Sequence, residues 1–337
     1  MSGAALSPPL AATLGDPAGI GPEILAKAWA ALRGTGPTFF VVGDARAFAD
    51  GAPIARIVGP TDAPAVFYDA LPVLDLPLPF PPAPGAPSPR AAPCVARWIE
   101  IAVGLALSGA AAGVVTAPIA KAMLYQGGFR HPGHTELIGE LAARAPFAGV
   151  RGPVMMLTAQ DLRVALVTVH EPLAKVPSLL TEERIVRTGR VTAEALVRDF
   201  GVARPRLVVA GLNPHAGEGG ALGDEEIEVV APAVGALRAL GIDAKGPLPA
   251  DSLFHADARA TYDAALCLYH DQALIPVKML DFWGGVNLTL GLPIVRTSPD
   301  HGTAFDIAAR GVARADSIIA ALRLAAEISG RRRAAPP

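Results

Sequence analysis

Excess charge of one sign, cysteine, aromatic residues and long apolar runs are all scarce in this chain of 337 residues. Lys and Arg number 29 against 31 Asp and Glu, so the chain lacks the basic excess that is typical of nucleic-acid-binding proteins. Its two cysteines, Cys94 and Cys267, form no CxxC pair, which excludes a disulfide framework and fits a reducing cytoplasm. No stretch of about 18 uncharged apolar residues occurs, so we expect no membrane span. The N-terminus also lacks the basic and apolar regions of a secretion signal.

The composition nevertheless indicates a folded chain, because apolar residues make up 51 % of it and charged residues only 18 %. Aromatic residues contribute 5 %, so we expect an interior of small, closely packed side chains. Short runs rich in Val, Leu and Ile alternate with helical patterns, and this alternation predicts an α/β fold with parallel strands. We expect strands at 10–14, 38–42, 113–116, 154–157, 164–169, 206–211 and 264–269, and helices at 23–32, 181–200, 224–240 and 315–328.

One segment and several missing motifs limit the possibilities further. Residues 72–93 contain nine prolines, which predicts an extended surface connection without a helix or a central strand. The chain has no GxGxxG after a strand, no GxxxxGK[ST], no GxSxG and no HExxH. Any nucleotide site must therefore differ from the usual dinucleotide fingerprint.

Three of the seven histidines follow predicted strands. His170 ends RVALVTVH, His215 follows RLVVAGL after a short turn, and His270 ends AALCLYH. In α/β sheets ligands bind outside the carboxyl ends of the strands. Three imidazoles there could hold a divalent metal with one open coordination position, as in catalytic zinc sites. The alternative interpretation is three independent capping or surface histidines.

Charged and polar neighbours favour the metal interpretation. Asp271 follows His270 directly and Asp251 lies in the turn-rich segment PLPADSLF, where each could orient a ligand ring, take a proton or simply cap a helix. Basic residues are few, and Lys278 and Arg296 both follow this region. A Lys and an Arg near a metal suit an anionic substrate such as a phosphate, although Lys278 could also extend from a helix to solvent.

Two glycine-containing loops are candidate anion sites. Residues 15–24, GDPAGIGPEI, join a predicted strand to a helix whose N-terminus favours an anion. Residues 301–308, HGTAFDIA, offer Gly302 and the amides of a helix start with Thr303 as its cap, which suits a pyrophosphate or an adenosine. Neither pattern is specific by itself.

Taken together, these segments resemble one family, the 4-hydroxythreonine-4-phosphate dehydrogenases of vitamin B6 (pyridoxal 5'-phosphate) biosynthesis. The resemblance runs in order from about residue 10 to 330 and leaves out only the proline-rich stretch. The segments that carry it are GDPAGIGPEI (15–24), TAPIAKAML (116–124), PGHTELIGE (132–140), GLNPHAGEGGALGDEE (211–226), GPLPADSLF (246–254), YHDQALIPVK (269–278) and GVNLTLGLPIVRTSPDHGTAFDIA (285–308).

The resemblance implies a fold related to isocitrate and isopropylmalate dehydrogenases, with two α/β/α domains and a cleft between them. We expect residues 1–130 plus 295–337 to form the first domain, and residues 131–294 to form the second, which carries the metal and the dimer interface. The family is an obligate homodimer whose divalent metal (zinc, magnesium or cobalt) is held across the dimer interface by three histidines. These correspond to His170, His215 and His270.

The resemblance also implies substrate contacts and a cofactor loop. The substrate contacts correspond to His134, Thr135, Lys278, Asn287 and Arg296, and His131 is an additional imidazole beside His134. The loop that binds the adenosine of NAD or NADP corresponds to His301, Gly302, Thr303, Ala304 and Asp306.

The implied reaction is NAD(P)-linked oxidation of 4-phosphooxy-L-threonine to 2-amino-3-oxo-4-phosphooxybutanoate, which loses CO2 to give 3-amino-2-oxopropyl phosphate. Lys278, Asp251 and Asp271 are the candidate acid–base groups. One alternative is a relative that oxidises a phosphorylated sugar acid or a carboxylated dihydrodiol. Another is a three-histidine metallohydrolase that needs no NAD(P), and a non-catalytic binding protein is a further, weaker one. We expect no nucleic-acid or membrane partner.

Overall fold

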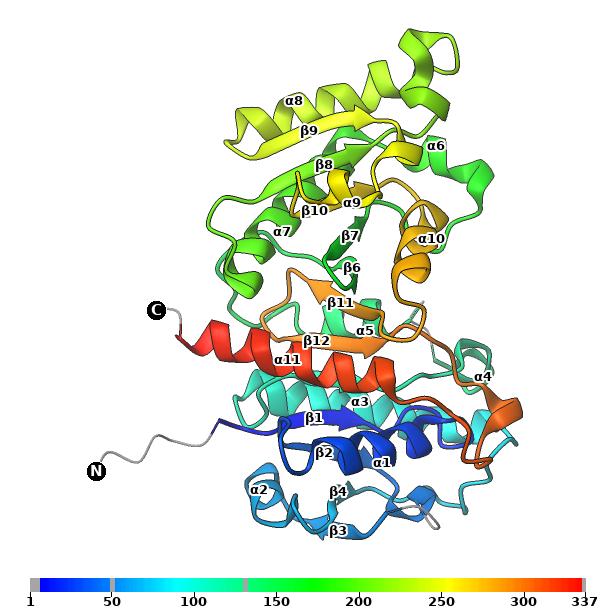
Figure 1. The fold of residues 1–337 in the computed structure, drawn as a ribbon. Helices are drawn as coiled ribbons and strands as arrows, with labels where there is room; N and C mark the ends of the chain where they lie inside the picture. Colours follow the sequence, from blue (N-terminus) through cyan, green and yellow to red (C-terminus); the bar gives the residue numbers. More distant parts are fainter. Residues whose placement is uncertain (1–6, 49–51, 130–132, 335–337) are drawn as a thin grey trace. The chain divides into compact units, whose positions relative to one another are not determined.

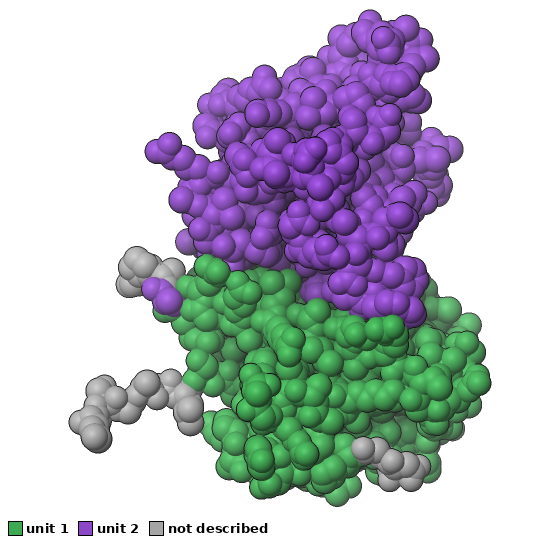
Figure 2. Space-filling view, viewed as in Figure 1, with its two compact units in different colours: residues 1–146, 292–333 green, residues 147–291, 334–337 purple. Residues whose placement is uncertain are grey.

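The computed structural model describes residues 7–48, 52–129 and 133–334, so His131 lies outside the described residues. The chain divides into two compact units, residues 1–146 with 292–333 and residues 147–291 with 334–337 (Figure 2). Helix α5 (His134–Leu141), which the predicted boundary assigned to the middle segment, therefore belongs to the first unit, where it contacts α3. Among the described residues, no helix is long and apolar enough to cross a bilayer.

Unit 1 is an all-parallel sheet with helices on both faces. Its strand order is β3-β4-β2-β1-β5-β12, and every pairing is parallel. Figure 1 shows α1 and α11 on the near side of this sheet and α3 on the far side. The strands are β1 (Leu10–Thr13), β2 (Phe39–Gly43), β3 (Ile54–Ile57), β4 (Leu71–Asp75), β5 (Val114–Thr116) and β12 (Arg296–Pro299), and the main helices are α1 (Gly21–Leu32), α3 (Ala92–Leu107), α4 (Lys121–Gln126), α5 and α11 (Asp316–Ala334).

Unit 2 combines parallel and antiparallel strands in the order β11-β6-β7-β10-β8-β9. Strands β7, β10, β8 and β9 are parallel to one another, whereas β6 is antiparallel to both of its neighbours. Its elements are β6 (Val154–Ala159), β7 (Leu162–Leu166), α6 (Val176–Leu179), α7 (Glu182–Phe200), β8 (Arg206–Ala210), α8 (Ala231–Ala239), β9 (Asp243–Leu248), α9 (Ala256–Arg259), β10 (Ala264–Cys267), α10 (His270–Leu280) and β11 (Val286–Leu290).

The alternation of side chains along β10 shows how unit 2 is covered on both faces. Ala265 and Cys267 belong to the core cluster that includes residues of α10, whereas Leu266 faces α7. Every residue of β10 is buried, as expected for a strand between two helical layers. The predicted α/β class is therefore confirmed.

The proline-rich stretch was only partly predicted. Pro72 lies in β4, an interior strand, where it pairs with Ala55 of β3 while the pairing with β2 starts one residue later, at Val73. Because β2 pairs with β4 only from Val73 onward, the missing N–H of Pro72 is tolerated in this strand. The following segment is anchored rather than loose, because the buried Asp44 carboxylate accepts from Leu78 N (2.9 Å). The expectation that residues 72–93 contain neither a helix nor a central strand was wrong, since α3 also begins within the segment, at Ala92.

Candidate functional site

The three strand-end histidines all belong to unit 2 and lie at one edge of its sheet. Strands β7, β10 and β8 are adjacent and parallel, so their carboxyl ends share that edge. His170 lies four residues after β7, His215 five residues after β8, and His270 is the first residue of α10. The order of the strands places the β10 end between the other two.

His170 and His270 are close together. Their ring centroids are 5.5 Å apart, and both line a cavity of about 310 Å³ together with Glu171, Tyr269 and Asp271. His270 Nδ1 lies 2.7 Å from Asp271 Oδ1, and His270 is only a third exposed. A carboxylate on Nδ1 fixes the ring orientation and leaves Nε2 for a ligand, which is the usual arrangement of a metal-binding histidine.

His215 lies on a separate, unusual turn. Residues 215–219 all have left-handed backbone angles, with φ between 45° and 80°, and three of them are not glycine. Such a conformation costs roughly 1–2 kcal/mol per non-glycine residue, so the surrounding contacts must impose it. Within the part of the chain that the structure describes, no three His, Cys, Asp or Glu side chains form a group that could hold a metal. A single chain thus brings together two of the three predicted ligands, His170 and His270.

The remaining predicted residues of unit 2 lie on different elements. Asp251 is exposed on the short turn η7 (Ala250–Ser252), which contacts η5 (Pro214–Gly220), the turn of His215. Lys278 is half-buried on α10, and its Nζ lies 5.2 Å from the ring centroid of Phe282. Asn287 lies on β11, and its buried Oδ1 has no hydrogen-bond partner among the described residues.

In unit 1, one predicted substrate residue, Arg296, places a positive charge in the interior. Arg296, on β12, is 2 % exposed, and its Nη2 donates to Thr116 Oγ1 (2.7 Å). Burial lowers the pKa of Arg296 to about 10, which leaves the guanidinium charged at neutral pH. The negative charge of Glu136 opposes this lowering and compensates part of the cost of burying the guanidinium. An anionic ligand would add to that compensation.

His134 adds a neutral ring near the charge of Arg296. It begins α5, followed by the half-buried Thr135. Burial, with the positive charges of Arg296 and Lys121, holds the pKa of His134 well below its usual value, so its ring is neutral. Its buried Nε2 has no hydrogen-bond partner within the described ranges. A neutral imidazole with a free ring nitrogen beside a buried cation is suited to an anion such as a phosphate.

The predicted cofactor loop also belongs to unit 1, and it differs from the expectation. Residues 301–304 are irregular and lead into a single turn, η8 (Phe305–Ile307), whose first flanking residue, Ala304, caps nothing with its side chain. The expectation that Thr303 caps a helix was therefore wrong. Instead Thr303 O accepts from Ile20 N (2.9 Å), and a Cβ on Gly19 would lie 2.8 Å from that oxygen. The glycine-rich loop thus holds the 301–306 loop in place, while His301, Gly302 and Asp306 are exposed.

Comparison with known proteins identifies the family. A model of the family described as "Pyridoxal phosphate biosynthetic protein PdxA" matches residues 36–325. The 4-hydroxythreonine-4-phosphate dehydrogenase of Caulobacter vibrioides is 66 % identical over 329 residues, which cover 97 % of this chain and 99 % of that protein. This chain belongs to the 4-hydroxythreonine-4-phosphate dehydrogenase family. The predicted family, and with it the prediction of an enzyme, is confirmed.

Solved structures support the same assignment. The crystal structure of 4-hydroxythreonine-4-phosphate dehydrogenase from Klebsiella pneumoniae is 40 % identical with a TM-score of 0.84, covering 97 % of this chain and 99 % of that one. A terephthalate 1,2-cis-dihydrodiol dehydrogenase from Burkholderia xenovorans has the same fold at 27 % identity and a TM-score of 0.63, covering 95 % and 98 %. The dihydrodiol enzyme is thus a more distant relative of this dehydrogenase family member.

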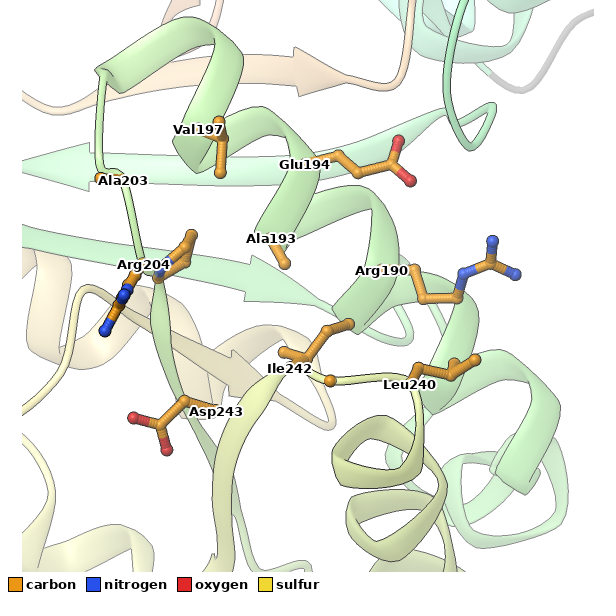
Figure 3. Close-up of a pocket in the computed structure, with 11 residues that line it drawn as sticks. Arg190, Ala193, Glu194, Val197, Ala203, Arg204, Leu240, Ile242 and Asp243 are labelled. Carbon is orange, nitrogen blue, oxygen red and sulfur yellow. The ribbon is translucent and has the colours of Figure 1, made fainter.

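A larger pocket in unit 2 lies away from the histidines. It has a volume of about 610 Å³ and is lined by α7 residues together with Pro205, which precedes β8, and Asp243, which begins β9. The pocket is therefore at the amino ends of these strands, opposite to the edge that follows their carboxyl ends. Figure 3 shows the side chains of Arg204 and Asp243 directed to one side and that of Arg190 to the other, so the three do not meet at a common point. The pocket thus lacks the convergent polar groups of a ligand site.

The sequence reasoning missed several polar residues that surround the predicted site. Lys121 lies close enough to lower the pKa of His134, and the buried Gln272 and Glu226 bond to the strand-end loops. All three are inside motifs that carried the family resemblance: TAPIAKAML, YHDQALIPVK and GLNPHAGEGGALGDEE. The signal that could have found Lys121 and Gln272 was a polar residue in an otherwise apolar helical pattern soon after a strand, whereas Glu226 lies in an acidic run that gives no such signal.

Proposed function

We propose that this protein oxidises 4-phosphooxy-L-threonine with NAD+ or NADP+ to 2-amino-3-oxo-4-phosphooxybutanoate, which decarboxylates to 3-amino-2-oxopropyl phosphate. The observation that carries the proposal is the pair His170–His270 at a sheet edge, with Asp271 on one of the rings. The relatives described above carry the name of this activity.

The donor chemistry fits a divalent metal. Imidazole nitrogen is a preferred ligand of zinc and cobalt, whereas magnesium prefers oxygen, so the donor pair favours Zn²⁺ or Co²⁺ over Mg²⁺. His170 and His270 of one chain would supply two ligands and His215 the third. When bound, the metal polarises the substrate hydroxyl as a Lewis acid and lowers its pKa.

The protein's own residues hold the substrate and move its proton. We propose that Arg296, His134 and Thr135 bind the phosphate and that Lys278 and Asn287 make further contacts with the substrate. The buried charge of Arg296 and the free Nε2 of His134 support the phosphate role.

Among the three candidate acid–base groups, the contacts separate Asp271 from the others. Asp271 bonds to His270 Nδ1 and therefore orients the ring. Lys278 and Asp251 remain the candidates for the group that takes the proton from the substrate hydroxyl. A pH–rate profile of each substituted enzyme would distinguish them, because only loss of the true base removes a limb of the profile.

In the 301–306 loop His301, Gly302 and Asp306 are exposed and the other residues are half-buried, which fits a cofactor that approaches from solvent. We propose that His301, Gly302, Thr303, Ala304 and Asp306 bind the adenosine of NAD(P), which accepts the hydride. We also propose a cytoplasmic enzyme, since both Cys94 and Cys267 are free thiols.

The distribution of the histidines supports a homodimer with a shared metal site. His170 and His270 lie 5.5 Å apart in one chain, while His215 forms no three-residue metal group with them. We propose that His215 of a second copy completes the set. Mixing His215→Ala protein with His270→Ala protein would then create one intact site per heterodimer, whereas mixing His170→Ala with His270→Ala would create none. Equal recovery in both mixtures, or in neither after proven subunit exchange, would contradict the shared site.

The deciding assay follows absorbance at 340 nm after 4-phosphooxy-L-threonine is added with NAD+ or NADP+, before and after treatment with EDTA. We expect NAD(P)H formation that EDTA abolishes and added Zn²⁺ or Co²⁺ restores. No signal with metal restored would reject this substrate. A carboxylated dihydrodiol or a phosphorylated sugar acid would then be tested in the same assay, and metal-dependent hydrolysis without NAD(P) would identify a hydrolase.

A further inference from the structure

A continuous set of buried hydrogen bonds connects the three strand ends that carry the histidines in unit 2. It begins at Thr168, two residues before His170, whose Oγ1 donates to Leu268 O (2.6 Å). Leu268 lies two residues before His270. The ends of β7 and β10 are therefore tied by a side-chain bond in addition to the bond from Thr168 N to the same oxygen (3.3 Å).

Gln272 continues the set from β10 to β8. Its Oε1 accepts from Leu268 N (2.7 Å), and its Nε2 donates to Gly211 O (2.7 Å) across 61 residues of sequence. The partners define the orientation of the amide, because a backbone N–H can only donate and a carbonyl can only accept. A glutamate would place a second acceptor against Gly211 O, and a methionine would satisfy neither partner. Glutamine is therefore suited to this position by having one donor and one acceptor.

Glu226 completes the set at the turn of His215. Its Oε1 accepts from Leu212 N and Asn213 N, both at 2.7 Å, and its Oε2 accepts from Asn213 Nδ2 (2.9 Å). Glu226 is 3 % exposed, so these bonds form away from water. They fix the chain two residues before His215, where the left-handed turn is about to begin.

We propose that Thr168, Gln272 and Glu226 act as one brace that positions the metal-binding histidines by locking the three strand ends to one another. The brace rests on the metal site of the proposed function. It requires no contact between its members and the metal, because each member bonds to backbone within two residues of a histidine. The three brace residues are thus positioning residues. They explain how His170 and the turn at His215 can have fixed positions although both are exposed.

The test measures binding of Co²⁺ alone to metal-free full-length protein, by titration and by the visible absorption of the bound ion. The variants are Thr168→Val, which removes one bond without changing shape, and Gln272→Glu, which makes the contact with Gly211 O repulsive. Thr168→Ser is the conservative rescue. Thr192→Val is the matched control, because Thr192 is fully buried on α7 and its Oγ1 has no hydrogen-bond partner among the described residues.

We expect Thr168→Val and Gln272→Glu to weaken Co²⁺ binding by about 10-fold and to alter the absorption band. This is the lower end of the loss seen when a ligand's own hydrogen-bond partner is removed, because the brace acts through the backbone. Thr168→Ser and Thr192→Val should bind like wild type. The brace is overturned if the first two variants fold and keep wild-type affinity and spectrum, with only their melting temperatures lowered. If Gln272→Glu does not fold, Thr168→Val decides the question. Wild-type protein that binds no Co²⁺ would overturn the proposed metal site, and the brace with it.

Discussion

Replacing Arg296 by methionine is expected to make the protein more stable and its use of a phosphorylated substrate much poorer. Burial lowers the pKa of Arg296 from 12.5 to about 10. Each unit of pKa corresponds to about 1.4 kcal/mol, so the buried charge costs the folded state about 3 kcal/mol at neutral pH. Methionine fills a similar volume without that charge, but it loses the hydrogen bonds of Arg296, among them the one to Thr116, and a bond of this kind from a charged group is worth about 1.5–3 kcal/mol. The expected net gain is at most about 2 kcal/mol in the free energy of unfolding.

The same substitution removes the charge that we assign to the substrate phosphate. Truncating one partner of a buried, hydrogen-bonded charge pair costs about 2–5 kcal/mol. At about 1.4 kcal/mol per factor of ten, kcat/KM for 4-phosphooxy-L-threonine should fall by about 30-fold to a few thousand-fold. Inhibition by inorganic phosphate should weaken in parallel, whereas turnover of an unphosphorylated analogue should change little.

The assay pairs urea unfolding with steady-state kinetics, and Arg56→Met is the matched control. Arg56 lies in the same unit, is 64 % exposed and pairs with Asp75 at the surface, so its loss should change stability by less than about 1 kcal/mol. A variant at position 296 that is less stable than wild type would refute the argument from burial. Equal losses of activity toward phosphorylated and unphosphorylated substrates would refute the phosphate contact.

Three further outcomes are expected. Because the pKa of His134 is lowered in the folded state, the unfolded chain binds one more proton as the pH falls below about 6.5. The free energy of unfolding should therefore fall on acidification by up to about 1.4 kcal/mol per pH unit. His134→Gln should lessen this slope in urea unfolding curves, and an unchanged slope would contradict the burial of His134. Gly217→Ala should destabilise the protein by at least about 1 kcal/mol, because φ is +80° and the new Cβ would lie 2.8 Å from Glu226 Oε2. Gly235 lies on α8 with open space around it, so Gly235→Ala should instead stabilise the protein by about 0.5–1 kcal/mol. Thermal melts that rank the two glycine variants in the opposite order would be inconsistent with the structure. Zn²⁺ at 100 times its Kd should add about 2.7 kcal/mol of stability to the wild type and much less to His270→Ala, and an equal gain in both would reject His270 as a ligand.

Much of the fold could be predicted because its central strands are continuous apolar runs. All of the seven expected strands are present, with ends that differ by up to a few residues. In the described parts of the chain, five further strands were missed, and their sequences show why. β12 begins with Arg296, Thr297 and Ser298, all buried, and a buried polar run has no periodic signal. β4 contains Pro72, and β9 contains Gly246 and Pro247, which usually mark turns.

The position of each histidine could be predicted because a polar residue after an apolar run marks the carboxyl end of a strand. Which histidines lie together could not. That depends on the strand order, in which β10 lies between β7 and β8 although it follows both in the chain. It also depends on the left-handed turn at 215–219, which packs against the helical turn of residues 226–230.

The residues that hold the site together are the least visible in the sequence, and their chemistry explains this. Thr168 and Gln272 act on backbone groups of other strands, so the identity of their partners is set by topology and not by neighbouring letters. A threonine just after a strand and a glutamine in a helix are each compatible with ordinary surface positions. Only their burial, at 1 % and 6 % exposure, shows that their polar atoms must be satisfied inside the protein. Since unsatisfied backbone groups at a strand end are costly, a residue that bonds to them also fixes where the following residue lies. The histidines can therefore be predicted from the sequence as candidate ligands. Their exact positions relative to one another depend on other side chains, whose role is visible only in the folded chain.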